Sequence, residues 1–284
     1  MFYLPIIGAI ALASATIMQR LIIKKKNIDI KLYNSAEFLA IVLVALPFIY
    51  FFWKVDSQAL ELKNLIIFFS IVIFSIIANL FTFYSMKWEK VSNLEPAKIL
   101  EPLFVILLAI VFSFLISSEN YERNLNVIIP AFIAGIALIF SHIKKHHLDF
   151  NKYFVAAIIG SFFFALELVL SKLILDFYSP LLFYFLRCLF ILIISLIIFR
   201  PQLEKLNNKI RIKILLIGFV WIIYRIAVYY GYQKLGVIST TLMLMLGPIF
   251  VYLLAHKFLK EKLEWRNIIA SIVIVASIGY VLLS

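Results

Sequence analysis

The sequence predicts an all-α membrane protein in which ten transmembrane helices form two inverted five-helix repeats. Of its 284 residues, 64% are hydrophobic and only 15% are charged, whereas a soluble domain carries roughly 25% charged residues. Apolar stretches long enough to cross a bilayer recur along the whole chain, and parts of the first half recur in the second half. These observations predict that most of the chain lies in lipid.

Ten apolar segments, each near the ~20 residues that a membrane-spanning helix needs, make up most of the sequence. Each is predicted to be a helix, because backbone amides cannot stay unpaired in hydrocarbon and no segment shows the alternation of a barrel strand. The connections are short, so no inserted soluble domain is expected. The segments are 3–23, 32–53, 64–86, 92–116, 124–143, 151–175, 179–199, 210–233, 236–258 and 265–283.

Two stretches of the first half align with stretches of the second. Residues 84–105 align with 229–251, and residues 7–22 align with 159–174. Each alignment matches a residue type that is rare in this chain. The matched residues are Pro102 with Pro248, and Gly8 with Gly160.

We therefore predict two structural repeats, residues 1–146 and 147–284, within one membrane unit. Each repeat holds an odd number of helices, so the second must enter the membrane from the opposite side. Inverted repeats of this kind are typical of secondary transporters, which bind their substrate near the midplane between the repeats.

The basic residues lie mainly in the loops and are unevenly distributed between them. The formal net charge is +12, and loops after odd-numbered segments hold eighteen Lys and Arg residues against five in loops after even-numbered segments. Such an excess marks the cytoplasmic side, so we predict a plasma-membrane protein with both termini outside. A nucleic-acid-binding protein would gather these charges on one face, and no nucleic acid is expected as a partner.

The segment 92–116 carries three charges within the membrane. Glu95, Lys98 and Glu101 are spaced by three residues, which places them within an arc of roughly 120° on one helix. Buried charges are costly and mark substrate or ion paths in transporters, so we predict that all three bind substrate. A static ion network that holds the helix against a neighbour is the alternative. Pro102 and its counterpart Pro248 predict a hinge in each half.

The segment 210–233 places an arginine among aromatic residues. Trp221, Arg225 and Tyr229 recur every four residues, with Tyr224 beside them, so the guanidinium is expected to rest on aromatic rings. Arg225 and Tyr224 are predicted to bind substrate. The repeat aligns Arg225 with Asn79, which is assigned to the same cavity. The assignment is completed by Tyr84 and Thr241.

Three further charges lie in other segments. Glu167, midway along 151–175, is the candidate proton carrier, because Lys98 favours the charged form of its own acidic neighbours. Arg187 and Glu37 lie nearer the ends of their helices and are predicted to be structural. The fifth and tenth segments have no charge in their interiors, so they are predicted to form the lipid-facing periphery.

The end of each half resembles a repeat of the drug/metabolite transporter superfamily, and in particular its EamA-type ten-helix transporters. The resemblance covers essentially the whole chain. It is most specific where a small-residue helix start is followed by a proline, a Glu-containing loop and a late glycine. The matching residues are Pro248, Glu261 and Gly279 in the second half, and Pro102 and Gly135 in the first.

The resemblance also implies a place for one arginine. Arg187 matches an arginine common in the second helix of the family's repeat, whereas the corresponding residue of the first half is Glu37, a departure from the pattern. What the family implies is carrier-mediated transport of small metabolites or drugs, often export. It also implies cytoplasmic termini, opposite to the orientation that the loop charges predict.

Together these features predict a secondary-active exporter of small metabolites that works by alternating access. Amino acids and other zwitterionic or anionic compounds are the expected substrates, the lipid bilayer is a partner, and protons are the candidate coupling ion. No enzyme activity, cofactor or metal is expected, since the chain has one cysteine, Cys188, and His146–His147 fits a solvated turn. A flippase of lipid-linked intermediates is the main alternative, ahead of a non-transporting membrane protein and a membrane enzyme.

Overall fold

The computed structural model describes residues 3–24, 28–88, 97–116, 121–142, 151–250 and 265–283. Within these ranges the chain folds into α-helices and short 3-10 helices without any β-strand; one isolated β-bridge joins Val55 to Tyr178. The predicted all-α fold is therefore confirmed. Four residues singled out in the sequence, Glu95, His146, His147 and Glu261, lie outside the described residues.

The described helices follow the predicted order along the chain. Seven of them are long and apolar enough to cross a membrane, and α5, α6 and α10 are shorter apolar helices. Ten membrane spans thus remain a prediction. The helices are α1 (Tyr3–Ile23), α2 (Ile30–Phe52), η1 (Ser57–Leu60), α3 (Leu62–Trp88), α5 (Leu100–Leu115), α6 (Leu125–His142), α7 (Lys152–Ile174), η2 (Leu175–Phe177), α8 (Pro180–Phe199), η3 (Leu203–Lys205), α9 (Asn208–Lys234), α10 (Val237–Leu244) and α12 (Trp265–Leu283).

Polar residues set the starts of three long helices. Asn151 accepts hydrogen bonds from the amides of Tyr153 and Phe154, Ser179 caps α8 just before its first residue, Pro180, and Asn207 caps α9. These are the side chains that best satisfy the free amides of a helix N-terminus, and proline fits the first helical position. Local sequence therefore fixes where α7, α8 and α9 begin.

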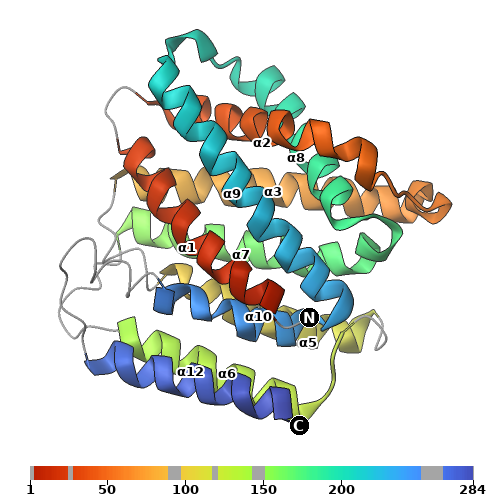
Figure 1. The fold of residues 1–284 in the computed structure, drawn as a ribbon, viewed down its shortest axis with the longest axis vertical. Coiled ribbons are helices and arrows are strands. Elements are labelled where there is room, and N and C mark those ends of the chain that lie inside the picture. The colour runs from red at the N-terminus through yellow and green to blue at the C-terminus, as the bar shows by residue number, and fades with distance from the viewer. Residues whose placement is uncertain are drawn as a thin grey trace.

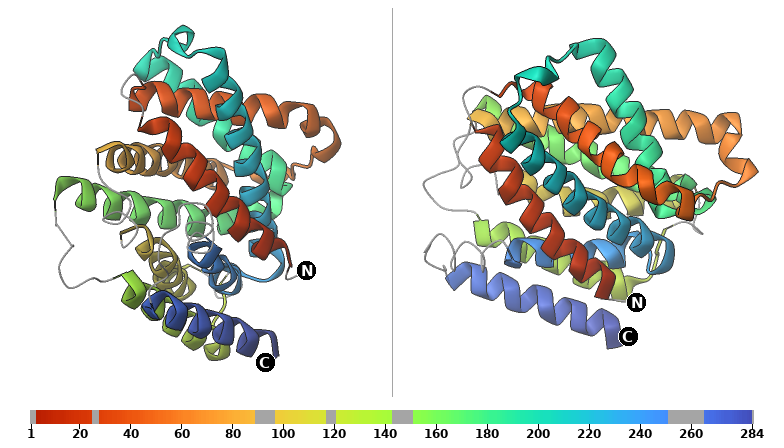
Figure 2. Two further views of the ribbon diagram at one scale, coloured as in Figure 1. Left: turned by 60° about the vertical axis from the view of Figure 1, so that its left-hand side comes forward. Right: turned by 45° about the horizontal axis from the view of Figure 1, so that its top comes forward.

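Helices α6 and α12 pack side by side at one edge of the molecule (Figure 1), and the views of Figure 2 agree. Helices α5 and α10 pack against each other and lie next to them, and the remaining helices form the larger part of the bundle. Because α6 and α12 correspond to the fifth and tenth apolar segments, their predicted peripheral position is confirmed. The charge-bearing helices surround the interior instead.

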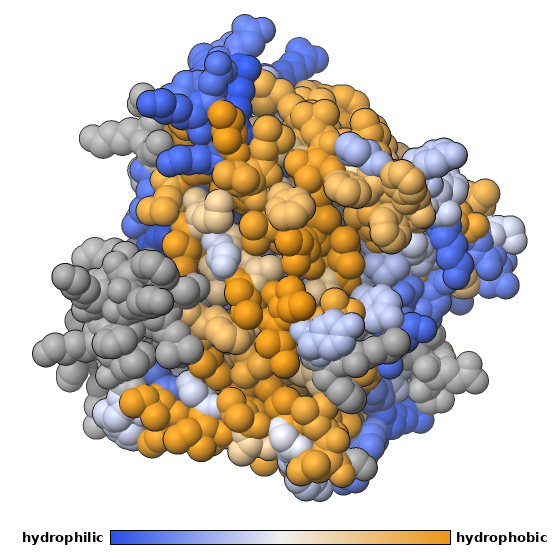
Figure 3. Space-filling view, viewed as in Figure 1, coloured by the Kyte–Doolittle hydropathy of each residue, from blue (hydrophilic) through white to orange (hydrophobic). Residues whose placement is uncertain are grey.

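The molecular surface is apolar between two hydrophilic margins. Figure 3 shows a broad hydrophobic area across the face of α1 and α9, with hydrophilic residues gathered at opposite sides. Large apolar side chains such as Leu46, Ile66 and Ile197 are exposed on the outer faces of α2, α3 and α8. An exposed apolar surface of this kind is expected of helices in contact with lipid.

One end of the bundle is held together by contacts between the two halves of the chain. The α2–α3 connection pairs with the α7–α8 connection, since the Asp56 amide donates to the Phe177 carbonyl at 2.8 Å and the Ser179 amide donates to the Lys54 carbonyl at 3.1 Å. We call this the tied end. The opposite end, which holds the α1–α2 and α8–α9 connections, is called the basic end; there Lys31 lies 5.7 Å from the centre of the Phe199 ring.

A second contact at the tied end joins Glu122, in the α5–α6 connection, to the start of α10. Its carboxylate accepts hydrogen bonds from the amides of Ile238 and Ser239 and from the Ser239 hydroxyl. Helix α10 has no capping side chain of its own, because its N-cap residue is Gly236. Glu122 therefore supplies the cap from the other half of the chain.

Candidate functional site

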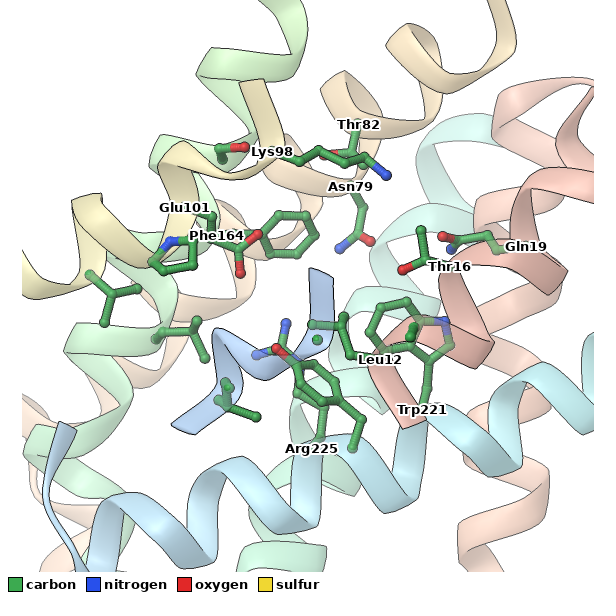
Figure 4. A pocket seen from close by; sticks show the side chains of 18 of the residues that line it. Leu12, Thr16, Gln19, Asn79, Thr82, Lys98, Glu101, Phe164, Trp221 and Arg225 are labelled. Atoms are coloured by element: carbon green, nitrogen blue, oxygen red, sulfur yellow. The ribbon is translucent and has the colours of Figure 1, made fainter. Parts of the chain in front are cut away.

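A cavity of about 170 Å³ lies within the bundle, between helices of both halves (Figure 4). Helices α1, α2, α3 and α5 of the first half line it together with α7, α8, α9 and α10 of the second. Its charged lining residues are Glu37, Lys98, Glu101, Arg187 and Arg225. Its polar and aromatic lining includes Thr16, Gln19, Asn79, Thr82, Ser161, Phe164, Tyr184, Trp221, Tyr224, Tyr232 and Thr241.

The lining residues of the two halves lie at different depths in the bundle. In α1 and α3 the lining residues lie in the second half of the helix, and in α2 and α5 they lie in the first half. Since α1 and α3 run toward the basic end and α2 and α5 start there, the four helices line the cavity on that side. The second half of the chain lines it from mid-helix residues of α7 and α9, and nearer the tied end from Tyr184 and Arg187 of α8 and Tyr232 of α9.

A buried ion cluster from three helices borders the cavity. Glu167 of α7 accepts a hydrogen bond from Arg187 of α8 and from the hydroxyl of Tyr229 at 3.0 Å, and its other oxygen lies 3.1 Å from Arg225 of α9. Glu167 is fully buried, and both arginines are nearly so. Protonation of Glu167 would leave two buried guanidinium groups without this counter-charge, a costly arrangement.

Aromatic rings cover the two arginines, but they are not all the rings that the sequence pattern indicated. Arg225 lies 5.6 Å from the centre of the Tyr224 ring, as predicted, and 5.8 Å from that of Phe164 in α7. The rings of Trp221 and Tyr229 were also predicted to support Arg225. Instead Trp221 packs edge-on against Tyr224, and Tyr229 lies by Arg187 and Glu167.

Glu37 has a separate environment on the α1 side of the cavity. Its carboxylate accepts hydrogen bonds from Gln19 at 2.9 and 3.1 Å and from the Tyr33 hydroxyl at 3.4 Å. Glu37 and Arg187, which were predicted to be structural, both line the cavity, where Arg187 bonds to Glu167. Each side chain points inward from its helix.

The α5 charges and the two matched prolines also lie at the cavity. Lys98, two residues before α5, and Glu101, in its first turn, both line it, and Figure 4 shows Glu101 on the side opposite Gln19. Pro102 and Pro248 are lining residues as well. The structure therefore brings the described part of the predicted charged segment and the predicted hinge residues to one place.

Of the remaining predicted residues, the structure brings Asn79 and Thr241 to the cavity but not Tyr84. The amide of Asn79 donates to the Ser75 carbonyl at 2.7 Å, and Thr241 is buried. Tyr84 instead packs on Tyr153, with ring centres 5.4 Å apart. Five residues along a helix correspond to a rotation of roughly 140°, so Asn79 and Tyr84 point to different sides.

Sequence analysis missed several polar lining residues. Thr16 and Gln19 lie three residues apart on α1, and Asn79 and Thr82 lie three apart on α3. Polar pairs at this spacing share one helix face, and on apolar helices they would have pointed to the cavity. Within the described residues, no cluster of three or more His, Cys, Asp and Glu side chains could hold a metal ion.

Comparison with known families agrees with this geometry. A family profile described as the EamA-like transporter family matches residues 151–283. This part of the chain is similar to an EamA-like transporter domain. The EamA-like domain runs from the start of α7 to the end of α12 and contributes Arg187 and Arg225 to the cavity. The predicted relationship to the drug/metabolite transporter superfamily is thereby confirmed.

A solved structure extends the likeness beyond the EamA-like domain. A protein described only by the words "Crystal structure of protein" superposes with a TM-score of 0.70 at 15% sequence identity, covering 99% of this chain and 96% of that chain. At this identity the likeness concerns the fold alone, and it includes the helices before residue 151. No curated protein sequence matches the chain.

Proposed function

We propose that this protein is a secondary-active carrier that exports small metabolites across the plasma membrane by alternating access. Its EamA-like domain belongs to a family of transporters, and it has several helices that can span a membrane. The observation that carries the proposal is a cavity lined by five charged residues inside an otherwise apolar bundle. Charges in such a place are expensive and mark transport paths in membrane proteins.

The packing of the helices supports two inverted five-helix repeats as the architecture. Under the predicted repeat, α1, α2, α3, α5 and α6 correspond in order to α7, α8, α9, α10 and α12. The pairing of α3 with α7 then corresponds to that of α9 with α1, and the pairing of α5 with α7 to that of α10 with α1; all four pairs pack together. A twofold relation between the halves would generate such matched pairs.

The matched glycines of the two halves support the same relation. Gly8 of α1 lies against α9, where an added Cβ would meet the Ala227 side chain at 3.0 Å. Gly160 of α7 lies against α3, where an added Cβ would have no room beside Thr82. In each half, therefore, the glycine allows the first helix to approach the third helix of the other half closely.

Alternating access needs one side closed while the cavity is reached from the other. The backbone bonds between the α2–α3 and α7–α8 connections, and the Glu122 cap on α10, hold the halves together at the tied end. The first-half helices line the cavity on the side of the opposite, basic end. By the charge of the loops the basic end is cytoplasmic and both termini are outside, so this arrangement fits a carrier that loads from the cytoplasm.

The contacts favour Glu37 over Glu167 as the group that binds a coupling proton. Glu167 balances two arginines, whereas the hydrogen bonds that Glu37 accepts within the described residues come from the uncharged Gln19 and Tyr33. A proton can thus join Glu37 without leaving a buried cation unbalanced.

Transport is tested by flux into liposomes containing purified protein, with Thr16→Trp as the blocking variant. Thr16 lines the cavity in α1, and a large ring there should fill the space and reduce flux at least tenfold. Ser14→Trp is the matched control, because Ser14 lies two residues away on α1, outside the cavity lining. Equal flux in the two variants, or none in the wild type for any amino acid, organic anion or organic cation, would contradict the proposal.

A further inference from the structure

Two arginines at the cavity share one carboxylate. Arg187 hydrogen-bonds to one oxygen of Glu167, and Arg225 Nη1 lies 3.1 Å from the other oxygen. The exposed fractions of the arginines are 3% and 5%, and Glu167 is 0% exposed. Two guanidinium groups and one carboxylate leave this cluster with one excess positive charge at the cavity wall. Charges interact strongly where water is excluded.

Both arginines also keep a buried donor without a hydrogen-bond acceptor among the described residues. These donors are Nε of Arg187 and Nη1 of Arg225; the second is ion-paired with Glu167 Oε2 at 3.1 Å, and neither of these two atoms has a partner in hydrogen-bond geometry. Buried polar groups normally have partners, and each exception needs a cause. Both side chains line the cavity, and Figure 4 shows Arg225 extending into it from α9.

Neighbouring rings fix the orientation of these donors. The Arg187 guanidinium lies 5.0 Å from the centre of the Tyr184 ring, and that of Arg225 lies 5.6 Å from the centre of the Tyr224 ring. A guanidinium held against a ring keeps its planar set of N–H groups pointing sideways, the geometry that binds a planar carboxylate with two parallel hydrogen bonds.

We propose that Arg225, positioned with Arg187 by Glu167, binds the carboxylate of the transported molecule, which is a small amino acid. This inference rests on the proposed transport function. A carboxylate carries one negative charge and balances the excess, whereas a phosphate group carries about −1.5 to −2 at neutral pH. The cavity has room for on the order of ten water molecules, which suits a small amino acid.

Glu101 provides the site for the amino group. It lines the cavity from α5, and its charge interacts with that of Arg225. The ionisable side chains around the cavity are three acidic ones, Glu37, Glu101 and Glu167, and three basic ones, Lys98, Arg187 and Arg225. A zwitterion adds no net charge to this set, whereas a simple anion or cation would.

Binding to the purified full-length protein tests the inference directly. Isothermal calorimetry would compare each standard amino acid with its primary amide, which keeps the amino group but has no carboxylate, and with inorganic phosphate. We expect at least one amino acid to bind at least tenfold more tightly than its amide. Equal binding of acid and amide, no binding of any amino acid, or tighter binding of phosphate than of every amino acid would overturn the assignment.

Substitutions at Arg225 locate the carboxylate. Arg225→Gln should bind the amino acid at least tenfold more weakly than the wild type, and it should fold because it leaves Arg187 and Glu167 as a balanced pair. Arg225→Lys keeps the charge without the planar donors and should bind with intermediate affinity. Arg123→Gln is the control, because Arg123 contacts Ser113 and Phe114 outside the cavity. Wild-type affinity in Arg225→Gln would refute the proposal.

The flux assay separates this inference from the transport function. If liposomes move a neutral or cationic solute in a way that Thr16→Trp blocks, but no amino acid binds, the carrier function holds and the carboxylate site fails. If an amino acid binds through Arg225 but no solute moves, the carboxylate site holds and the carrier function fails.

Discussion

The Glu122 carboxylate lies 2.5 Å from the Ile238 amide and 3.0 Å from the Ser239 amide, so one half of the chain caps a helix of the other half. The Ser239 hydroxyl adds a third hydrogen bond at 2.6 Å. Helix N-termini favour negative charge and need acceptors for their free amides. Capping by a distant residue therefore couples the stability of α10 to the position of the α5–α6 connection.

Gly236 makes this contact possible, and we predict that Gly236→Ala destabilises the protein. Gly236 has φ 90° and ψ 168°, a conformation that costs other residues about 1–3 kcal/mol. An added Cβ would also collide with the Glu122 carboxylate. The expected result is a lower thermal unfolding midpoint in detergent and weaker protection of the α10 amides from hydrogen exchange.

Gly279→Ala is the matched control for that prediction. Gly279 lies in α12, where an added Cβ meets no atom within 4 Å, so the substitution should leave the unfolding midpoint unchanged or raise it. Similar midpoints for the two alanine variants would contradict the account of Gly236.

The cap should also give stability a specific pH dependence. Burial raises the pKa of Glu122, and the hydrogen bonds from Ser239 and Ile238 act against that shift. The folded protein then holds this proton more tightly than the unfolded chain does. The contribution of Glu122 to the free energy of unfolding is therefore fully present below the ordinary Glu pKa of about 4.3. It is lost as the pH rises through the raised pKa of the folded state.

Glu122→Gln cannot titrate and removes that contribution. We expect the unfolding midpoint of the wild type, relative to that of Glu122→Gln, to fall between acidic and neutral pH. A midpoint difference that stays constant across this range would show that Glu122 does not titrate differently in the folded state. Glu61→Gln, at an exposed position in the α2–α3 connection, should track the wild type throughout.

The ion cluster predicts a large cost for removing its only acidic member. Glu167→Gln leaves Arg187 and Arg225 buried without the carboxylate that both contact, and losing one partner of a buried pair costs about 3–5 kcal/mol. Adding Arg187→Gln should recover part of the lost stability, because the double variant has lost one positive charge together with the negative one. A double variant no more stable than Glu167→Gln, measured by thermal unfolding, would argue against charge balance as the cause.

Sequence alone could predict the helical fold and most helix positions, because the length of an apolar segment and the helix-breaking residues that bound it are local properties of the sequence. It could not predict which charges meet. Arg187 contacts Glu167, twenty positions earlier on another helix, and that choice depends on how each helix is rotated in the bundle. Arg225 was correctly predicted to stack on aromatic rings. One of its two rings, however, is Phe164 of α7 and not a residue of its own helix α9.

The unknown rotation of each helix also explains which lining residues were predicted and which were missed. Glu101 and Arg225 were assigned to a cavity because charges in apolar segments have few other uses. Thr16 and Gln19 carry no charge and could equally have faced a neighbouring helix. Tyr84 was assigned to the cavity from its place in the sequence, which does not give the direction of a side chain.

Proton coupling gives the last prediction, because two buried carboxylates compete for the role. Glu37→Gln keeps the shape of the side chain and a donor and acceptor for Gln19, so it should fold and still exchange substrate between equal pools. It should lose concentrative transport driven by a proton gradient, by about tenfold, since the site can no longer bind and release a proton. Flux of labelled substrate with and without the gradient measures both properties.

The double variant Glu167→Gln with Arg187→Gln, which keeps the net charge of the wild-type ion cluster, is the companion measurement. It removes Glu167 as a proton carrier and leaves one arginine instead of two without the carboxylate, so gradient-driven transport should keep its dependence on pH. The opposite pattern, with dependence kept in Glu37→Gln and lost in the double variant, would assign the proton to Glu167. In that case the ion cluster would have to open during transport, because a protonated Glu167 can no longer balance Arg187 and Arg225.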